Sequence, residues 1–171
     1  QDISASSGSK ITLNGATVTA RTSADSAIRL VSSDADIINS TVTAINGAGI
    51  NAGRSSTSSG STVNVFGSTI SGSTIGASAT AFSQLNFFDS DVIATGATGI
   101  GVRLYGGNAT AVGSRIVGGE HGVRMMRESS VNNSAGLVLD GTSVEGKTGA
   151  AVAATNGINA DIQVLNRSTL I

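Results

Sequence analysis

The chain has 171 residues, enough for one domain of ordinary size, and a net charge of −1, which argues against binding nucleic acid or an anionic membrane surface. It contains no cysteine, which excludes a disulfide scaffold and a cysteine-ligated metal site. Its 39% of hydrophobic residues exclude a disordered low-complexity chain, although 23 residues are glycine and only 12% are charged.

One pattern returns along the whole chain: an apolar–x–apolar stretch, a small turn, then Ser or Thr and a branched residue. "STVNVFGSTI" (61–70) is a representative copy. The branched residue recurs seven times, at intervals of 22 to 28 residues, as Val18, Val42, Ile70, Val92, Ile116, Val144 and Leu170. This periodicity indicates a repeat protein.

A second short element follows each copy and is usually introduced by Gly or Ala. It alternates apolar and polar residues at 26–30, 48–52, 76–80, 101–105, 121–125 and 149–153. Each repeat is therefore predicted to hold two or three short strands separated by tight turns that are rich in Gly, Asn, Asp and Ser.

Strands of this length do not hold together alone, but they are stable when each pairs in parallel with its copy in the next repeat. The sequence thus predicts an all-β fold, a right-handed parallel β-helix of about seven coils with roughly 25 residues each. We expect residues 1–171 to form a single domain that is part of a longer chain, with residues 1–8 poorly ordered or acting as an N-terminal cap.

The two longest intervals contain polar insertions, "GRSSTSSGS" (53–61) and "RESSVNNSA" (127–135). Both follow the second element of their repeat, so we expect them to project from one edge of the β-helix, where solenoid proteins often bind.

The lines "STVNVFGSTISG", "NATAVGSRIVGGEHGVRM" and "GLVLDGTSVEGKTGAAVAA" resemble a pertactin-type autotransporter passenger domain. The resemblance implies a rod on the surface of a Gram-negative bacterium or outside the cell, acting in adhesion or self-association. Its partners would be a host cell-surface protein or glycan, or another copy of itself. No nucleic-acid partner is expected, and membrane attachment is expected only through a C-terminal membrane β-barrel, which these residues do not contain.

Parallel β-helices also include polysaccharide lyases and hydrolases, which need clustered carboxylates. The only close acidic pairs are Asp34 with Asp36 and Asp89 with Asp91, and we expect them near turns, where aspartate is common. The single histidine, His121, is expected at a solvated turn. We therefore expect no catalytic residue, no metal ion and no cofactor.

Three arginines share one local pattern, in "IRL" (28–30), "VRL" (102–104) and "VRM" (123–125). If their apolar neighbours point inward, Arg29, Arg103 and Arg124 point outward on one sheet. Guanidinium groups bind sulfate or carboxylate in a bidentate way, and a tyrosine ring can stack on a sugar face. The candidate site for an anionic glycan is therefore formed by Arg103, Arg124, Tyr105, Arg115 and Arg127. The alternative is a solvated face with Glu120 and Glu128 as partial counter-ions.

Three functions thus compete. The leading hypothesis is a non-catalytic, surface-exposed passenger that acts in adhesion or self-association. The alternative is a carbohydrate-active β-helix enzyme or a tailspike-like polysaccharide-binding fragment. An ice-binding solenoid would need a regular threonine array, which Thr17, Thr41 and Thr69 begin but Asp91 interrupts.

Overall fold

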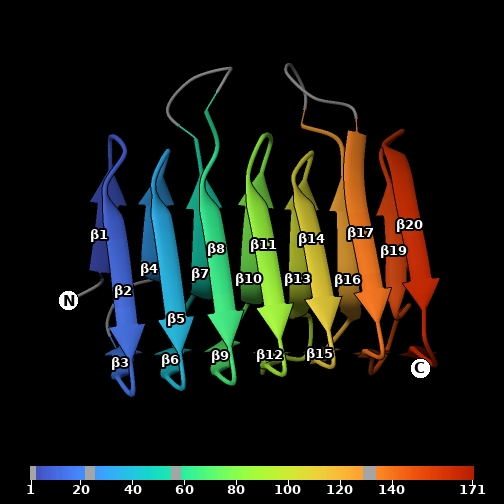
Figure 1. Ribbon diagram of the computed structural model, residues 1–171. Helices are drawn as coiled ribbons and strands as arrows, with labels where there is room; N and C mark the ends of the chain where they lie inside the picture. Colours follow the sequence, from blue (N-terminus) through green and yellow to red (C-terminus); the bar gives the residue numbers. More distant parts are fainter. Residues whose placement is uncertain (1–2, 22–25, 55–58, 129–133) are drawn as a thin grey trace.

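In the computed structural model, residues 3–21, 26–54, 59–128 and 134–171 are described. Within them, 21 strands form three parallel sheets of seven strands, and each pass of the chain adds one strand to every sheet (Figure 1). The N-terminus lies at one end of the stack and the C-terminus at the other. The first and last passes are separated by about 29 Å at the usual inter-strand spacing.

We call the three sheets A, B and C. Successive strands along the chain belong to them in that order. Sheet A contains β1 (Ile3–Ser6), β4 (Ser26–Val31), β7 (Ala48–Gly53), β10 (Ile75–Thr80), β13 (Ile100–Tyr105), β16 (His121–Met126) and β19 (Val152–Thr155). Sheet B contains β2 (Lys10–Asn14), β5 (Asp34–Ile38), β8 (Thr62–Phe66), β11 (Gln84–Phe88), β14 (Asn108–Val112), β17 (Ser134–Asp140) and β20 (Asn159–Leu165). Sheet C contains β3 (Thr17–Ala20), β6 (Thr41–Ala44), β9 (Thr69–Gly72), β12 (Asp91–Ala94), β15 (Arg115–Gly118), β18 (Ser143–Gly146) and β21 (Thr169–Leu170).

The predicted parallel β-helix is confirmed, and each repeat holds three strands. The branched residues that defined the repeat are direct neighbours in sheet C, one in each strand from Val18 in β3 to Leu170 in β21. The interval of about 25 residues therefore measures one pass around the solenoid.

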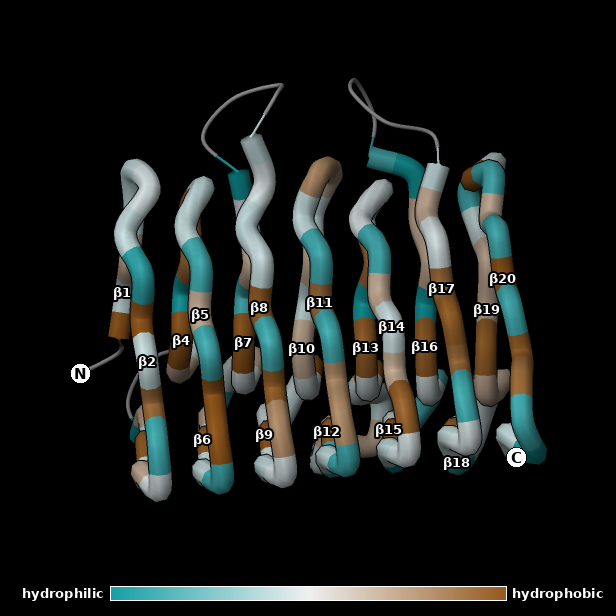
Figure 2. The backbone as a smooth tube through the Cα atoms, in the orientation of Figure 1, coloured by the Kyte–Doolittle hydropathy of each residue, from teal (hydrophilic) through white to brown (hydrophobic). Residues whose placement is uncertain are grey.

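The core is built by alternation along each strand, which Figure 2 displays as hydrophobic segments between hydrophilic ones. Inward positions in the inner passes are fully buried, as at Ile28, Ile37 and Val92, and Phe87 is the largest of these side chains. Successive side chains in a strand point to opposite faces, so a period of two places every second residue inside.

Buried hydroxyl groups form a ladder at the turn from sheet B to sheet C, the B–C corner. Its members bond in sequence: the Ser40 N–H donates to Ser68 Oγ (2.9 Å), the Ser68 N–H to Ser90 Oγ (3.2 Å), and the Ser90 N–H to Ser114 Oγ (3.1 Å). Each hydroxyl also donates to the carbonyl two residues earlier, at 2.7 Å for Ser68 and Ser90. The corner therefore turns without leaving these buried polar groups unpaired.

The residue before each hydroxyl has a left-handed backbone. Asn39 (φ 47°), Gly67 (φ 52°), Asp89 (φ 48°) and Gly113 (φ 59°) occupy this position. Glycine adopts this conformation without a steric penalty, and asparagine and aspartate tolerate it better than other residues. The sequence "G/N/D–S–x–branched" is thus a corner motif.

Glycine also recurs at the second position of sheet A strands, as at Gly76 in β10 and Gly101 in β13, for a different reason. A Cβ atom on Gly76 would lie 2.5 Å from the Gly101 carbonyl oxygen, and one on Gly101 would lie 2.6 Å from the Gly122 carbonyl oxygen. These positions need glycine because the backbones of successive passes approach too closely for a side chain.

The first eight residues, which we expected to be poorly ordered or to cap the stack, contain β1, which pairs with β4 at the edge of sheet A. Each insertion lies in a connection from sheet A to sheet B, which we call the A–B corner. One follows β7 and the other follows β16. Within these insertions, residues 55–58 and 129–133 lie outside the described residues.

The variant Val92→Asp tests whether Val92 and its equivalents in other repeats point into the core. We expect this variant to lose at least about 3 kcal/mol of stability, because an unpaired carboxylate would be buried in the core between Ile70 and Ile116. Urea denaturation followed by circular dichroism measures the loss. Ile93→Asp, at the adjacent outward position, is the matched control and should cost little. Equal losses in the two variants would contradict the assignment.

Candidate functional site

The arginines predicted to share a sheet do lie in one outward column of sheet A. The column runs Arg29, Asn51, Ser78, Arg103 and Arg124, one residue in each strand from β4 to β16. In Figure 2, hydrophilic segments on β4, β7, β13 and β16 interrupt otherwise apolar strands. We refer to Arg29, Arg103 and Arg124 as the arginine column.

Arg103 is held in place by one side chain of the preceding strand and one of its own strand. Its Nη2 donates a hydrogen bond to Ser78 Oγ at 3.4 Å, and its Cζ lies 5.0 Å from the centre of the Tyr105 ring. The Tyr105 ring therefore stacks on a guanidinium, where we had expected a sugar. Burial lowers the pKa of Arg103, and the charge of Arg124 adds to this effect, while Tyr105 opposes it.

The arginine column has no carboxylate partner within the described residues. The Nε atoms of Arg103 and Arg124 are buried without a hydrogen-bond acceptor. The two expected counter-ions lie against other groups: Glu120 Oε1 is 3.7 Å from His121 Nε2, and Glu128 pairs with Arg54. The guanidinium groups of Arg103 and Arg124 are thus partly desolvated cations without a compensating anion among the described residues.

A hollow of about 350 Å³, which we call the trough, lies between Arg29 and Arg103. These arginines are three strands apart, about 14 Å at the backbone, and the two positions between them carry the shorter side chains Asn51 and Ser78. The trough is lined by Ser26, Arg29, Ala48, Asn51, Thr74, Ile75 and Arg103. Among the described residues, its polar lining consists of guanidinium, hydroxyl and amide groups, without a carboxylate.

A second hollow of about 350 Å³ adjoins the trough towards the A–B corner. It is lined by Arg29, Leu30, Val31, Asn51, Gly53, Arg54, Thr80 and Glu128. Arg54 Nη2 donates to Glu128 Oε1 at 2.6 Å, and Glu128 Oε2 accepts from the Ala81 N–H at 2.9 Å. This ion pair joins the starts of the two insertions, which are three passes apart.

The structure brings together three of the five predicted site residues and separates the others. Arg103, Arg124 and Tyr105 are neighbours on sheet A. Arg115 lies on sheet C, where its Nε is 2.9 Å from Asp91 Oδ1. Arg127 is exposed beyond the end of β16.

Sequence reasoning did not assign Asn51, Ser26 or Thr74 to the site. Asn51 shares the column of Arg29, so a strand-by-strand alignment of the second elements would have placed it beside that arginine. Ser26 and Thr74 carry no such signal, because each is one of many small polar residues.

The acidic pairs have structural partners. Asp36 lies within β5, not in a turn, where Lys10 Nζ is 2.6 Å from its Oδ2 and Asn64 Nδ2 donates to its Oδ1 at 2.9 Å. Asp34 Oδ1 accepts from the Thr62 N–H, and Asp89 occupies the left-handed turn position. Within the described part of the chain, no three His, Asp or Glu side chains form a group able to hold a metal ion.

His121 is the first residue of β16, where a turn position had been expected. Its Nδ1 accepts a hydrogen bond from the Ala150 N–H at 3.1 Å, so the ring joins successive passes of the chain.

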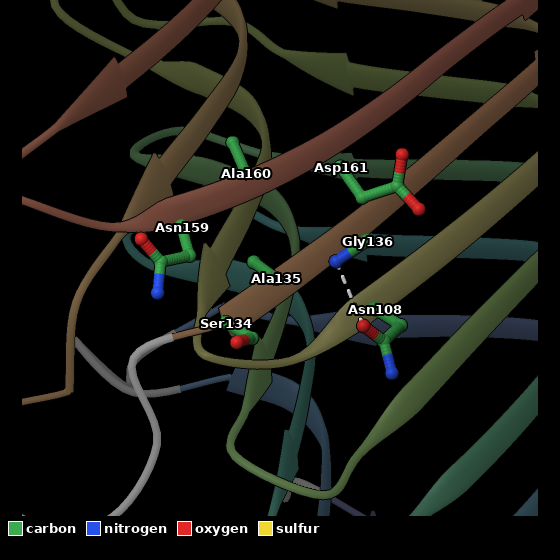
Figure 3. A pocket seen from close by; sticks show the side chains of 7 residues that line it. All are labelled: Asn108, Ser134, Ala135, Gly136, Asn159, Ala160 and Asp161. Atoms are coloured by element: carbon green, nitrogen blue, oxygen red, sulfur yellow. Dashed lines mark hydrogen bonds between the residues drawn. The ribbon is translucent and has the colours of Figure 1, made fainter.

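A third hollow opens on sheet B, beside the start of β17 (Figure 3). Gly136 lies between Asn108 and Asp161 in neighbouring strands, and its missing side chain leaves the gap. The Gly136 N–H donates to Asn108 Oδ1 at 2.8 Å, the bond drawn in Figure 3. Among the described residues, the hollow offers one carboxylate, Asp161, beside mostly small side chains.

Comparison with known protein families, curated proteins and solved structures finds no match. The fold itself defines the class: the chain is a parallel β-solenoid with a repeat of about 25 residues. Among the described residues, no helix long and apolar enough to span a lipid bilayer is present.

The environment of Asp36 yields a pH prediction. The hydrogen bond from Asn64 is the main cause that lowers the pKa of Asp36, and Lys10 adds to it. A carboxyl group whose pKa is lowered on folding stabilises the fold above its unfolded pKa, about 3.9, and this contribution is lost as the pH falls through the folded value.

We therefore expect Asn64→Leu to raise the pKa of Asp36 and to weaken the loss of stability below about pH 4. An NMR titration of the Asp36 carboxyl carbon measures the shift. Asn86→Leu is the control, because Asn86 donates to Asn64 and not to Asp36. An unchanged Asp36 pKa in Asn64→Leu would refute this account.

Proposed function

We propose that the protein is a non-catalytic binding protein, displayed at a bacterial surface or secreted, that adheres to anionic glycans through sheet A. The proposed class is the autotransporter passenger that the sequence pattern resembles. The observation that carries the proposal is the arginine column, with three cations on one outward face and no carboxylate partner within the described residues.

Binding of an anion would offset the unfavourable electrostatic energy of the arginine column. Stacked arginines repel one another, and those that are partly buried lose hydration. A sulfate or carboxylate group would accept charge-assisted hydrogen bonds from the guanidinium groups, which are stronger than bonds between neutral partners. A glycan is favoured over a small anion because the face is open and extends over several strands.

A carbohydrate-active enzyme is the less favoured alternative. Glycoside hydrolysis requires two carboxyl groups that are free to act on one bond. The described pairs are engaged: Asp36 by Lys10 and Asn64, and Asp91 by Arg115. A tailspike-like fragment that binds polysaccharide without cleaving it would use the same arginine column.

Adhesion is tested by measuring binding of the chain to immobilised heparin by surface plasmon resonance. We expect Arg103→Gln/Arg124→Gln to bind at least about tenfold more weakly, because two guanidinium contacts are lost. Competition by soluble heparin for binding to epithelial cells extends the test to an intact surface.

Arg115→Gln is the matched control, since it removes the same charge from sheet C, where Arg115 already pairs with Asp91. If it weakens binding as much as Arg103→Gln alone does, the interaction depends on total charge and the proposed site is wrong.

Self-association is a second candidate function, favoured by an apolar strip on the outer face of sheet B. The strip consists of Ile38, Phe66, Phe88 and Val112, which are neighbours in successive strands. The two phenylalanine rings stack at 4.9 Å, and Phe66 is 39% exposed. Exposed apolar surface of this kind marks an interaction site.

The order of residues in the strip fits a second copy of the chain. A two-fold axis between Phe66 and Phe88 would pair Ile38 with Val112 of the other copy. It would also bring Asn14 and Asp140, which flank the strip, into donor–acceptor contact. Such mutual pairing is the property of a two-fold symmetric interface.

Analytical ultracentrifugation tests this interface. We expect Phe66→Ser/Phe88→Ser to weaken self-association at least about tenfold, because the central aromatic contacts are lost. Phe82→Ser is the control, since Phe82 is 45% exposed but lies outside the strip. A wild-type chain that stays monomeric up to its solubility limit would exclude self-association through this strip.

A further inference from the structure

The trough and the second hollow adjoin one another on sheet A. They share Arg29 and Asn51, and each has a volume of about 350 Å³. The trough lies towards the starts of the strands, at Ser26, Ala48 and Ile75. The second hollow lies towards their ends, at Val31, Gly53 and Thr80. A ligand that fills both therefore lies parallel to the strands, across the long axis of the stack. Each hollow has room for one sugar unit.

The trough is suited to an anionic group. Arg29 and Arg103 approach it from opposite sides, and Arg103 already leans into the gap, as its contact with Ser78 at 3.4 Å indicates. Asn51 and Thr74 add neutral hydrogen-bonding groups. Because the described residues that line the trough include no carboxylate, the trough attracts a sulfate or carboxylate and repels a cation.

The second hollow is suited to an uncharged sugar. The charge of Arg54 is offset by Glu128 at 2.6 Å, so among the described residues that line this hollow only Arg29 remains without a carboxylate partner. Glu128 supplies acceptor oxygens for sugar hydroxyls, and the Asn51 amide can donate and accept. An acidic sugar in this hollow would bring its own carboxylate close to that of Glu128, which is unfavourable for like charges.

We infer that sheet A recognises an acidic glycan in which a charged sugar is directly followed by an uncharged one. The charged unit occupies the trough, and the uncharged unit occupies the second hollow beside Glu128. This inference rests on the proposed function, because it assigns the ligand class of the same face.

Isothermal titration calorimetry with three tetrasaccharides tests the inference. The probes are a hyaluronan tetrasaccharide, which alternates acidic and neutral sugars, a tetragalacturonate, in which every sugar is acidic, and chitotetraose, which is neutral. We expect the alternating probe to bind at least about tenfold more tightly than the all-acidic one, and the neutral probe to show no binding. Arg29→Gln and Arg103→Gln should each weaken binding of the alternating probe.

Glu128→Gln tests the second hollow. Its amide oxygen can still accept from the Ala81 N–H, so the local backbone contact is kept while the negative charge is removed. We expect this variant to bind the all-acidic probe more tightly and thereby to reduce the preference for the alternating one. Glu145→Gln, on sheet C, is the matched control and should leave the preference unchanged. Thermal denaturation verifies that each variant is folded.

The outcomes separate the two proposals. If the all-acidic probe binds as tightly as the alternating one, or if Glu128→Gln leaves the preference unchanged, the inference is overturned while anion binding stands. If neither acidic probe binds, or if Arg29→Gln and Arg103→Gln have no effect, the proposed function itself fails.

Discussion

The structure depends on one repeated constraint, the hydroxyl ladder at the B–C corner. Each of Ser40, Ser68, Ser90 and Ser114 joins its own turn to the next pass through a buried hydrogen bond. A left-handed residue precedes each hydroxyl and a buried branched residue follows it two positions later. A shift by one residue would expose the branched side chain and bury a polar one, so the ladder fixes the register of the whole solenoid.

Because the register is fixed, residues that are far apart in the sequence become neighbours in a column across the strands. Asp36, Asn64 and Asn86 come from three repeats, yet their side chains form a hydrogen-bonded series on sheet B. The arginine column and the apolar strip arise in the same way on different faces. The surface of the solenoid is thus determined by which residue each repeat supplies at a given position. Local features of the surface arise where one repeat supplies a different residue from its neighbours. Arg29 and Arg103 define the trough because Asn51 and Ser78 are shorter.

The fold could be predicted from the sequence because the pattern is local: the branched residue recurs seven times, from Val18 to Leu170, and four of these residues complete the full corner motif. The position of Arg29, Arg103 and Arg124 on one sheet followed from the same alternation. The candidate site was harder to predict from the sequence. Arg115 is close to Arg103 along the chain, but it belongs to sheet C, because each repeat divides among three sheets. The Arg54–Glu128 pair joins residues 74 positions apart through irregular segments, where no periodicity indicates which side chains meet.

The spacing of Arg29 and Arg103 is set by the number of strands between them, since each intervening pass separates them by one inter-strand distance of about 4.8 Å. The width of the trough can therefore change only in whole inter-strand steps. Removal of one complete repeat would narrow it by one step, and duplication would widen it by one, while the corner motif would preserve the core. If the proposed glycan binding holds, a gain or loss of one repeat would change the size of the ligand that fits, without new side chains at the point of contact.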